Sequence, residues 1–452
     1  MDNLIMQFYA LSMQHLLTMP QSFLYANFPK AIESVGKRNG KLSVFVSRNH
    51  VEDFEEAARW QAMSTYAQEP YYGVLLSAAQ DCLGGASIRE LMTAWSVVRS
   101  ISLKLCDFTI NDEDERMPHE WIAEYVPVIQ VDAIARGIQE ATGFAFAHAQ
   151  KIVQFLTYRG DQGQELYSQP LVPVGEAVVS PCLAAIHSPN LRRLCDIWLR
   201  QLGVDLEKRG PAFEAHIRSQ VRSMMASSPL LSKGVTLADA MHFDEPDERV
   251  EEIDLVAVIG ELVILGEAKC ILQPTEAKEV AMHRKRLSDA AIQIGRKAAA
   301  VRRSPAAFRQ QLAALGCACP EVFEVLPLII LNNAVHAGFP VDGVPVVDEN
   351  ILEVFFSGEL HDAAVQRSSG AIDAVKKRIL YDSLADAVSK ATDYFSAPPQ
   401  LDIFKRSVVH RSILVPPMNQ DDWYGEYITV ECEVNIDADA LLSGNSPGAS
   451  ST

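Results

Sequence analysis

The sequence predicts an α+β protein of several domains: a helical N-terminal region, a core with the order α-β-β-β-α-β, and an α/β C-terminal extension. Its 452 residues correspond to two to four domains at roughly 100–200 residues each. Helical spacing dominates the first part of the chain, and apolar strands alternate with long helices in the middle. We place the segments at 1–125, 126–190, 191–335, 336–440 and 441–452.

Composition and charge exclude several classes of protein. Hydrophobic residues make up 48% and charged residues 22% of the chain, as in ordinary globular proteins. The net charge of −18 argues against coating nucleic acid or an anionic membrane by bulk charge, so nucleic-acid binding needs a local basic patch. The eight cysteines are scattered, and the Cys317/Cys319 pair is a weak zinc signal, so we expect reduced thiols in a cytoplasmic protein.

The N-terminal stretch 1–21 is apolar but has no basic segment and is interrupted by Pro20. We therefore expect an amphipathic helix rather than a signal peptide. No run of 18 or more apolar residues occurs in the sequence, so we expect no membrane association.

The segment 1–125 is expected to be mainly helical, and its clearest helix covers 87–105. The motif "GKRNGK" at 36–41 is one residue too short between its glycines for a phosphate-binding loop, so we interpret it as an ordinary loop. This helical region is a candidate surface for a partner protein or for a second copy of the chain, giving a homo-oligomer.

The segment 126–190 has a different pattern, with two helices that end at Gly143 and Gly160, then two short strands about Gly175. Helix, helix and ribbon is the order of a winged helix, which can present its second helix to DNA. Lys151 is the one basic residue on that helix before Arg159. A structural or protein-docking role is therefore an equal alternative.

The α-β-β-β-α-β core is predicted from the stretch 211–333. It begins with a helix near Pro211, followed by a strand within 234–243 and an apolar hairpin over 250–270. A long helix over 274–303 and a buried strand over 323–333 complete it. Beyond it, short strands and helices alternate, and the final "SGNSPGASST" has the composition of a disordered tail.

Acidic residues in the apolar hairpin point to chemistry. Because side chains alternate along a strand, Ile253, Leu255 and Ala257 are expected on one face, and Asp254, Val256 and Val258 on the other. Glu267 and Lys269 likewise share a face. If that face lies beside Asp254, two carboxylates and an ammonium meet on one sheet.

Two neighbouring carboxylates repel each other, and a divalent cation between them removes that penalty. Oxygen ligands favour Mg²⁺ or Mn²⁺, and the lysine can then hold an attacking water or offset charge on a phosphate. A second Glu-Ala-Lys occurs at 276–278, where a helix is predicted. Residues two apart on a helix do not face each other, so this copy cannot form the same site.

Asp254, twelve intervening residues, then Glu267-Ala268-Lys269 resembles the PD-(D/E)XK nuclease superfamily, in particular its Mrr- and NERD-like branches. The resemblance covers about residues 205–335 and implies a restriction-endonuclease-like core. It implies a metal held by Asp254 and Glu267, with Lys269 as the catalytic lysine. Ile253 stands where the name-giving proline would be, so the match is to the looser form of the motif.

The resemblance extends to two helices. A glutamate on the first helix often completes the metal shell in this superfamily, and Glu214 matches it; the alternative is a glutamate favoured by a helix N-terminus. Mrr-like members place a glutamine on the helix after the lysine strand, and Gln293 matches it; the alternative is polar helix surface.

The helix over 278–303 carries eight basic residues against Glu279 and Asp289. In a chain of net negative charge this is a local positive stripe that can follow a phosphate backbone, although such runs are often only solvated surface. We take five members as candidate nucleic-acid contacts: Lys278, Arg284, Lys285, Arg296 and Lys297.

Together these features favour a Mg²⁺-dependent endonuclease that hydrolyses DNA phosphodiester bonds. The resemblance implies a 5′-phosphate product and a setting in restriction or phage defence. Two alternatives remain open. One is an inactive nuclease-fold module for binding or assembly, in which the hairpin charges form salt bridges. The other is a nuclease that acts on RNA or branched DNA.

Overall fold

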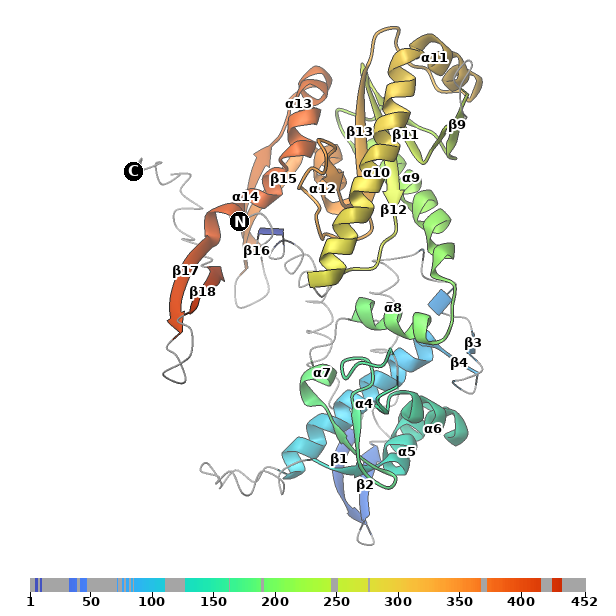
Figure 1. The fold of residues 1–452 in the computed structure, drawn as a ribbon, viewed down its shortest axis with the longest axis vertical. Coiled ribbons are helices and arrows are strands. Elements are labelled where there is room, and N and C mark those ends of the chain that lie inside the picture. The colour runs from blue at the N-terminus through green and yellow to red at the C-terminus, as the bar shows by residue number, and fades with distance from the viewer. Residues whose placement is uncertain are drawn as a thin grey trace. The chain divides into compact units, whose positions relative to one another are not determined.

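The computed structural model has two compact units, one of residues 15–209 and one of residues 1–14 with 210–452. We call them the first and the second unit (Figure 1). The expected boundary at 190 falls inside the first unit, and the expected boundary at 335 falls inside the second. The structure describes these residues: 5, 6, 9, 32–38, 41–46, 71, 75, 76, 79, 80, 83, 85–109, 127–161, 163–187, 191–244, 251–274, 277–366, 372–415 and 425–432.

The first unit mixes helices with small antiparallel sheets. Its helices are α4 (Ile88–Thr109), α5 (Val131–Thr142), α6 (Phe146–Phe155), α7 (Leu183–His187) and α8 (Leu191–Gln201). Its strands are β1 (Ile32–Arg38), β2 (Lys41–Val46), β3 (Ala79–Gln80), β4 (Ala86–Ser87), β5 (Ile129–Gln130), β6 (Leu171–Gly175) and β7 (Val178–Pro181).

The apolar face predicted for 87–105 is buried in α4. Trp95 and Trp198 are both fully buried, and their ring centroids lie 5.5 Å apart. The indole N–H of Trp198 donates to the carbonyl of Ser168 at 3.0 Å, which satisfies its polar group inside the core. Gly137 lets α5 approach closely, because a Cβ there would lie 3.0 Å from the side chain of Ile101 and 3.1 Å from that of Val44.

The expectation of a mainly helical N-terminal segment is incomplete. β1 and β2 form an antiparallel hairpin, and the "GKRNGK" motif spans its turn, with Gly36 to Arg38 in β1 and Lys41 in β2. The tip residues 39 and 40, and most of the predicted helix over 1–21, lie outside the described residues.

The order of elements predicted for 126–190 is observed, although the second helix ends at Phe155 and not at Gly160 as predicted. α5 ends at Gly143 in the left-handed conformation, α6 follows, and the β6–β7 hairpin comes next. β5 adds a third strand, giving the sheet order β5-β7-β6. Sequence reasoning missed β5 because it is only two residues long.

The second unit is built on a five-stranded mixed sheet. The strand order is β14-β13-β12-β11-β8. β12 (Leu262–Lys269) runs parallel to β13 (Glu324–Leu331) and antiparallel to β11 (Leu255–Ile259). β8 (Val235–Thr236) and β14 (Val346–Val347) are the two edges. A separate pair, β9 (Met241–Phe243) and β10 (Glu251–Ile253), precedes β11.

The order α-β-β-β-α-β predicted for 211–333 is therefore too simple. The stretch predicted as one strand over 234–243 forms β8 and β9, and the first strand of the predicted hairpin is divided into β10 and β11. Helices α9 (Arg209–Ser227) and α10 (Ala277–Arg303) are the two predicted ones, but α11 (Pro305–Ala314) is inserted before β13. The mixed α and β character of the chain is confirmed.

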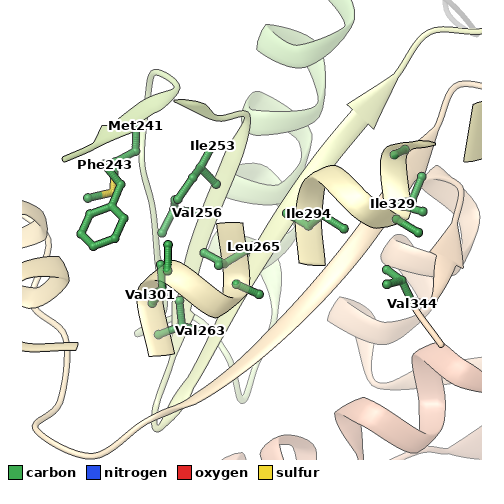
Figure 2. Close-up of a cluster of buried hydrophobic side chains, with 14 of the residues drawn as sticks. Met241, Phe243, Ile253, Val256, Val263, Leu265, Ile294, Val301, Ile329 and Val344 are labelled. Atoms are coloured by element: carbon green, nitrogen blue, oxygen red, sulfur yellow. The ribbon is translucent and has the colours of Figure 1, made fainter. Parts of the chain in front are cut away.

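The apolar core of the second unit lies between α10 and one face of the sheet (Figure 2). Val256, Val263 and Leu265 from β11 and β12 pack with Ile294 and Val301 from α10, and all five side chains are almost fully buried. Buried apolar area of this extent is the main stabilising term for the pair of layers.

The rest of the second unit follows β13. It contains α12 (Glu349–Ser357), β15 (Glu359–Gln366), β16 (Ile372–Ile379), α13 (Leu384–Ser396), α14 (Asp402–Ser407), β17 (Val408–Val415) and β18 (Gly425–Cys432). The N-terminal Tyr9 packs here too, and its hydroxyl donates to Asp348 at 3.0 Å. The polar tail predicted for 441–452 lies outside the described residues.

Candidate active site

Asp254 lies at a break between β10 and β11, not in the middle of a strand as predicted. The break explains a second difference from the prediction: Ile253 joins the same core as Val256, although an unbroken strand would place them on opposite faces. Two hydrogen bonds hold the bend. The Ala268 N–H donates to Asp254 Oδ2 at 2.9 Å, and Arg218 Nη1 donates to the Asp254 carbonyl at 2.8 Å.

The antiparallel register brings Asp254 beside Glu267. Leu255 pairs with Gly266, so the next position along each strand places Asp254 and Glu267 together. Glu267 follows Leu265 by two residues and therefore faces α10, as Leu265 does. The side chain of Glu267 is only 5% exposed. Two acidic residues thus enter a buried space between the sheet and α10.

Lys269 ends β12 on the same face. Its ammonium donates to Glu267 Oε1 at 2.6 Å and to Gln293 Oε1 at 3.0 Å. The Lys269 side chain is 29% exposed, so this part of the site opens toward solvent. The structure therefore brings Gln293 into the site through a contact with the predicted catalytic lysine.

Lys297 is the residue whose position differs most from expectation. We expected it on the outward basic stripe, but its side chain is only 8% exposed, and its ammonium donates to Glu267 Oε2. The same ammonium lies 3.6 Å from Asp254 Oδ1. It therefore bridges the two carboxylates from the side of α10.

The electrostatics of the site are dominated by burial of the two carboxylates. The pKa of Asp254 is raised to about 6, first by burial and then by the negative charge of Glu267, while Lys297 and the hydrogen bond from Ala268 act in the opposite direction. The two carboxylates thus repel each other even with an ammonium between them.

Glu214 lies on α9 at the border of this cluster. Burial raises its pKa; the guanidinium of Arg218 lowers it, and the carboxylates of Glu252 and Glu267 raise it. Glu214 is therefore within electrostatic range of the site. Among the described residues, no hydrogen bond joins it to Asp254 or Glu267, and Arg218 is the α9 residue in direct contact with the Asp254 backbone.

The other members of the basic stripe lie on the outside of α10. Lys278, Arg284 and Lys285 are exposed. Arg296 is 48% exposed and makes a two-pronged ion pair with Glu251 of β10, at 2.6 and 3.0 Å. Three of the five candidate contacts are thus open to solvent, and Arg296 has a partner within the fold. Glu276 of the second Glu-Ala-Lys lies outside the described residues.

A divalent cation of the hard type fits the donor chemistry of this place. Asp254 and Glu267 present carboxylate oxygens to one buried point, where their mutual repulsion favours a cation. Among the described residues, no group of three or more His, Cys, Asp and Glu side chains could hold a metal ion. The protein thus supplies two carboxylates, with Glu214 at the border. Cys317 and Cys319, the weak zinc signal, are free thiols.

Comparison with protein-family models, with curated proteins and with solved structures finds no match to this chain. In the part of the chain that the structure describes, no helix combines the length and the apolar character that crossing a membrane requires.

Two features of the site escaped the sequence analysis. Gln293 and Lys297 are four residues apart, and this spacing places them on one face of a helix. It could have assigned Lys297 to the site together with Gln293. The role of Arg218 had no local signal, because it joins α9 to a strand break 36 residues later.

Proposed function

We propose that this chain is a Mg²⁺- or Mn²⁺-dependent nuclease that hydrolyses phosphodiester bonds of DNA. The observation that carries the proposal is the cluster between β12 and α10, in which Glu267 pairs with Lys269 and the ammonium of Lys297 joins Glu267 to Asp254. The sequence motif selected Asp254, Glu267 and Lys269 by their spacing alone. The strand register and the hydrogen bonds of the site support the same selection.

In this proposal Asp254 and Glu267 hold the divalent cation, with Glu214 as a further candidate. When bound, the cation stabilises negative charge that develops on the phosphate oxygens. Lys269, held by Glu267 and Gln293 and partly open to solvent, orients the attacking water. The water oxygen bonds to phosphorus and loses a proton; the bond from phosphorus to the leaving oxygen breaks, and that oxygen takes up a proton.

The exposed cations of α10 support a nucleic-acid substrate. Lys278, Arg284 and Lys285 lie on the helix that also supplies Gln293 and Lys297 to the site. Neutralising the phosphates of a backbone along α10, these side chains would release the counterions condensed on the nucleic acid, a source of affinity that does not depend on base sequence. Cutting of foreign DNA, in restriction or phage defence, is the setting that the resemblance favours.

A second candidate function rests on the ion pairs of the site. Glu267 already contacts the ammonium groups of Lys269 and Lys297, so the cluster can also act as a closed salt-bridge network in an inactive binding or assembly module. The two candidates differ in their response to a cation. A metal site gains thermal stability with Mg²⁺ or Mn²⁺ by linkage, and Asp254→Ala abolishes the gain; a salt-bridge network does not respond.

The substrate is tested by competition. Labelled duplex DNA is cleaved in the presence of unlabelled duplex, single-stranded DNA, branched DNA or RNA. The proposal predicts that unlabelled duplex DNA is the strongest competitor. Stronger competition by RNA or by branched DNA would keep the reaction and change the substrate.

A further inference from the structure

Lys297 differs from Lys269 in what its ammonium contacts. Lys269 contacts one carboxylate, Glu267, and the amide oxygen of Gln293. Lys297 contacts Glu267 through the other carboxylate oxygen and lies 3.6 Å from Asp254 Oδ1. Of the two lysines, Lys297 is the one that spans both carboxylates, and it does so with a side chain only 8% exposed.

A divalent cation between Asp254 and Glu267 would take the place of this ammonium and neutralise the same two carboxylates. An ammonium and a divalent cation repel each other strongly at contact distance in a buried place. The two charges therefore cannot both lie between the carboxylates. Binding of the cation requires Lys297 to leave its bridging position, and the carboxylates then exchange one counter-ion for another.

We propose that Lys297 is an internal counter-ion which the divalent cation displaces, so that this side chain sets the affinity of the site for the cation. The inference rests on the proposed function, since it concerns the cation of the same site. Lys297 thus opposes cation binding, and in the cation-free site it holds the two carboxylates together.

The packing of α10 permits this movement. The helix is held to the sheet by apolar side chains, among them Leu287, Ile294 and Val301, and on its outer side by the Arg296–Glu251 pair. Anchoring of the helix therefore does not depend on Lys297. Its four-carbon stem is flexible and carries the charge at the tip, so the ammonium can move while the backbone of α10 stays in place.

The test measures Mn²⁺ and Mg²⁺ affinity by isothermal titration calorimetry on the full chain without nucleic acid. Three proteins are compared: wild type, Lys297→Met and Lys233→Met. Lys233 is an exposed residue of the second unit, next to the strand β8 that pairs with the far end of β11. Its substitution removes the same charge away from the site. We expect Lys297→Met to bind Mn²⁺ at least about tenfold more tightly than wild type, and Lys233→Met to bind it as wild type does.

Each outcome separates this inference from the proposed function. Saturable binding with equal or weaker affinity in Lys297→Met overturns the counter-ion role and leaves the cation site standing. Absence of saturable binding in all three proteins overturns the cation site itself, and the inference with it. If circular dichroism shows that Lys297→Met does not fold, Lys297→Gln takes its place, because it removes the charge but keeps a hydrogen-bond donor.

Discussion

Two adjacent residues of α10 make ion pairs of opposite kinds. Arg296 pairs with Glu251 through Nε and Nη2, one cation to one carboxylate, and its side chain is 48% exposed. Lys297 is buried between two carboxylates, and Glu267 is shared with a second ammonium from Lys269. The first arrangement is geometrically complete. The second leaves two carboxylates in repulsion, which is typical of a functional site rather than of a structural contact.

The pKa shifts express the same difference. The hydrogen bonds that Arg296 donates to Glu251 raise the pKa of Arg296, so this pair stabilises the charged guanidinium. In the site, burial and then the charge of Glu267 raise the pKa of Asp254 to about 6. A fold that needed only to join α10 to the sheet could do so with pairs of the first kind.

The largest expected effect comes from removing the shared carboxylate. Glu267→Gln leaves Lys269 without a charged partner and leaves the buried Lys297 with Asp254 alone, at 3.6 Å, and should lower the free energy of unfolding by about 3–5 kcal/mol. Arg296→Gln removes a half-exposed charge but leaves Glu251, whose side chain is only 7% exposed, without its cation, and should cost about 1–3 kcal/mol. Urea denaturation of both variants measures the contrast. Equal losses would mean that the two ion pairs are of the same kind.

The next effect is the pH dependence of stability. The pKa of Asp254 is raised from 3.8 to about 6 in the folded chain, so the folded state binds this proton more tightly than the unfolded state does. Ionised Asp254 therefore costs stability above pH 6, and the cost disappears as pH falls from about 7 to 4. Wild type should gain up to about 3 kcal/mol relative to Asp254→Asn over this range.

Because other groups titrate in the same window, the measured quantity is the difference between wild type and Asp254→Asn in urea midpoints at each pH. Asp348, whose pKa burial also raises to about 6, contributes equally to both proteins and cancels. A difference that does not change with pH would contradict a raised pKa at Asp254.

A smaller effect is expected at Gln293. Its amide oxygen accepts from Lys269 at 3.0 Å, so it positions the lysine without touching the substrate itself. Gln293→Ala should lower kcat about tenfold and leave KM within about twofold, since the interaction acts on the reacting state. Gln293→Glu, which keeps the acceptor, should restore most of the rate. Loss in KM alone would assign Gln293 to substrate binding.

The smallest effect concerns the outside of α10. Lys285→Gln removes an exposed cation, and should reduce the slope of log affinity for duplex DNA against log salt by about one unit. Arg296→Gln should change the slope less, because the guanidinium is engaged with Glu251. Filter binding at several salt concentrations with Ca²⁺ in place of Mg²⁺ gives both slopes. Equal slopes for the two variants would contradict the expectation that Lys285 contributes more to phosphate binding than the paired Arg296 does.

The sequence predicted a site of Asp254, Glu267 and Lys269, whose role stays a prediction. It also predicted the helix, hairpin, helix and strand around them, but not α11 between α10 and β13. These follow from local patterns: alternation in β12, the turn at Gly260, which adopts a left-handed φ of 57°, and the helical periodicity of α10. Local patterns could not reveal the break at Asp254, because the bend is fixed by Ala268 and Arg218, which are distant in sequence. A run of alternating residues is indistinguishable from a straight strand until those partners are in place.

The opposite roles of Arg296 and Lys297 show the same limit. In the sequence they are two neighbouring cations of one basic stripe. In the structure they lie on different faces of α10, because successive residues are about 100° apart around a helix axis. Lys297 falls seven residues after the buried Ala290 and four before the buried Val301, so the helical repeat places it on the inner face. Because Lys297 is charged, we expected it on the outer face, although the helical periodicity already indicated the inner face.

The most direct test of the account is cleavage of supercoiled plasmid, linear duplex and single-stranded DNA with Mg²⁺ or Mn²⁺, by wild type beside Lys269→Ala and Lys233→Met. We expect metal-dependent cutting by wild type and Lys233→Met, and cutting at least about 100-fold slower by Lys269→Ala. Equal cutting by all three proteins would contradict the assignment of the site. Absence of cutting by all three, together with absence of any Mg²⁺- or Mn²⁺-induced thermal stabilisation, would favour the salt-bridge network of a binding module instead.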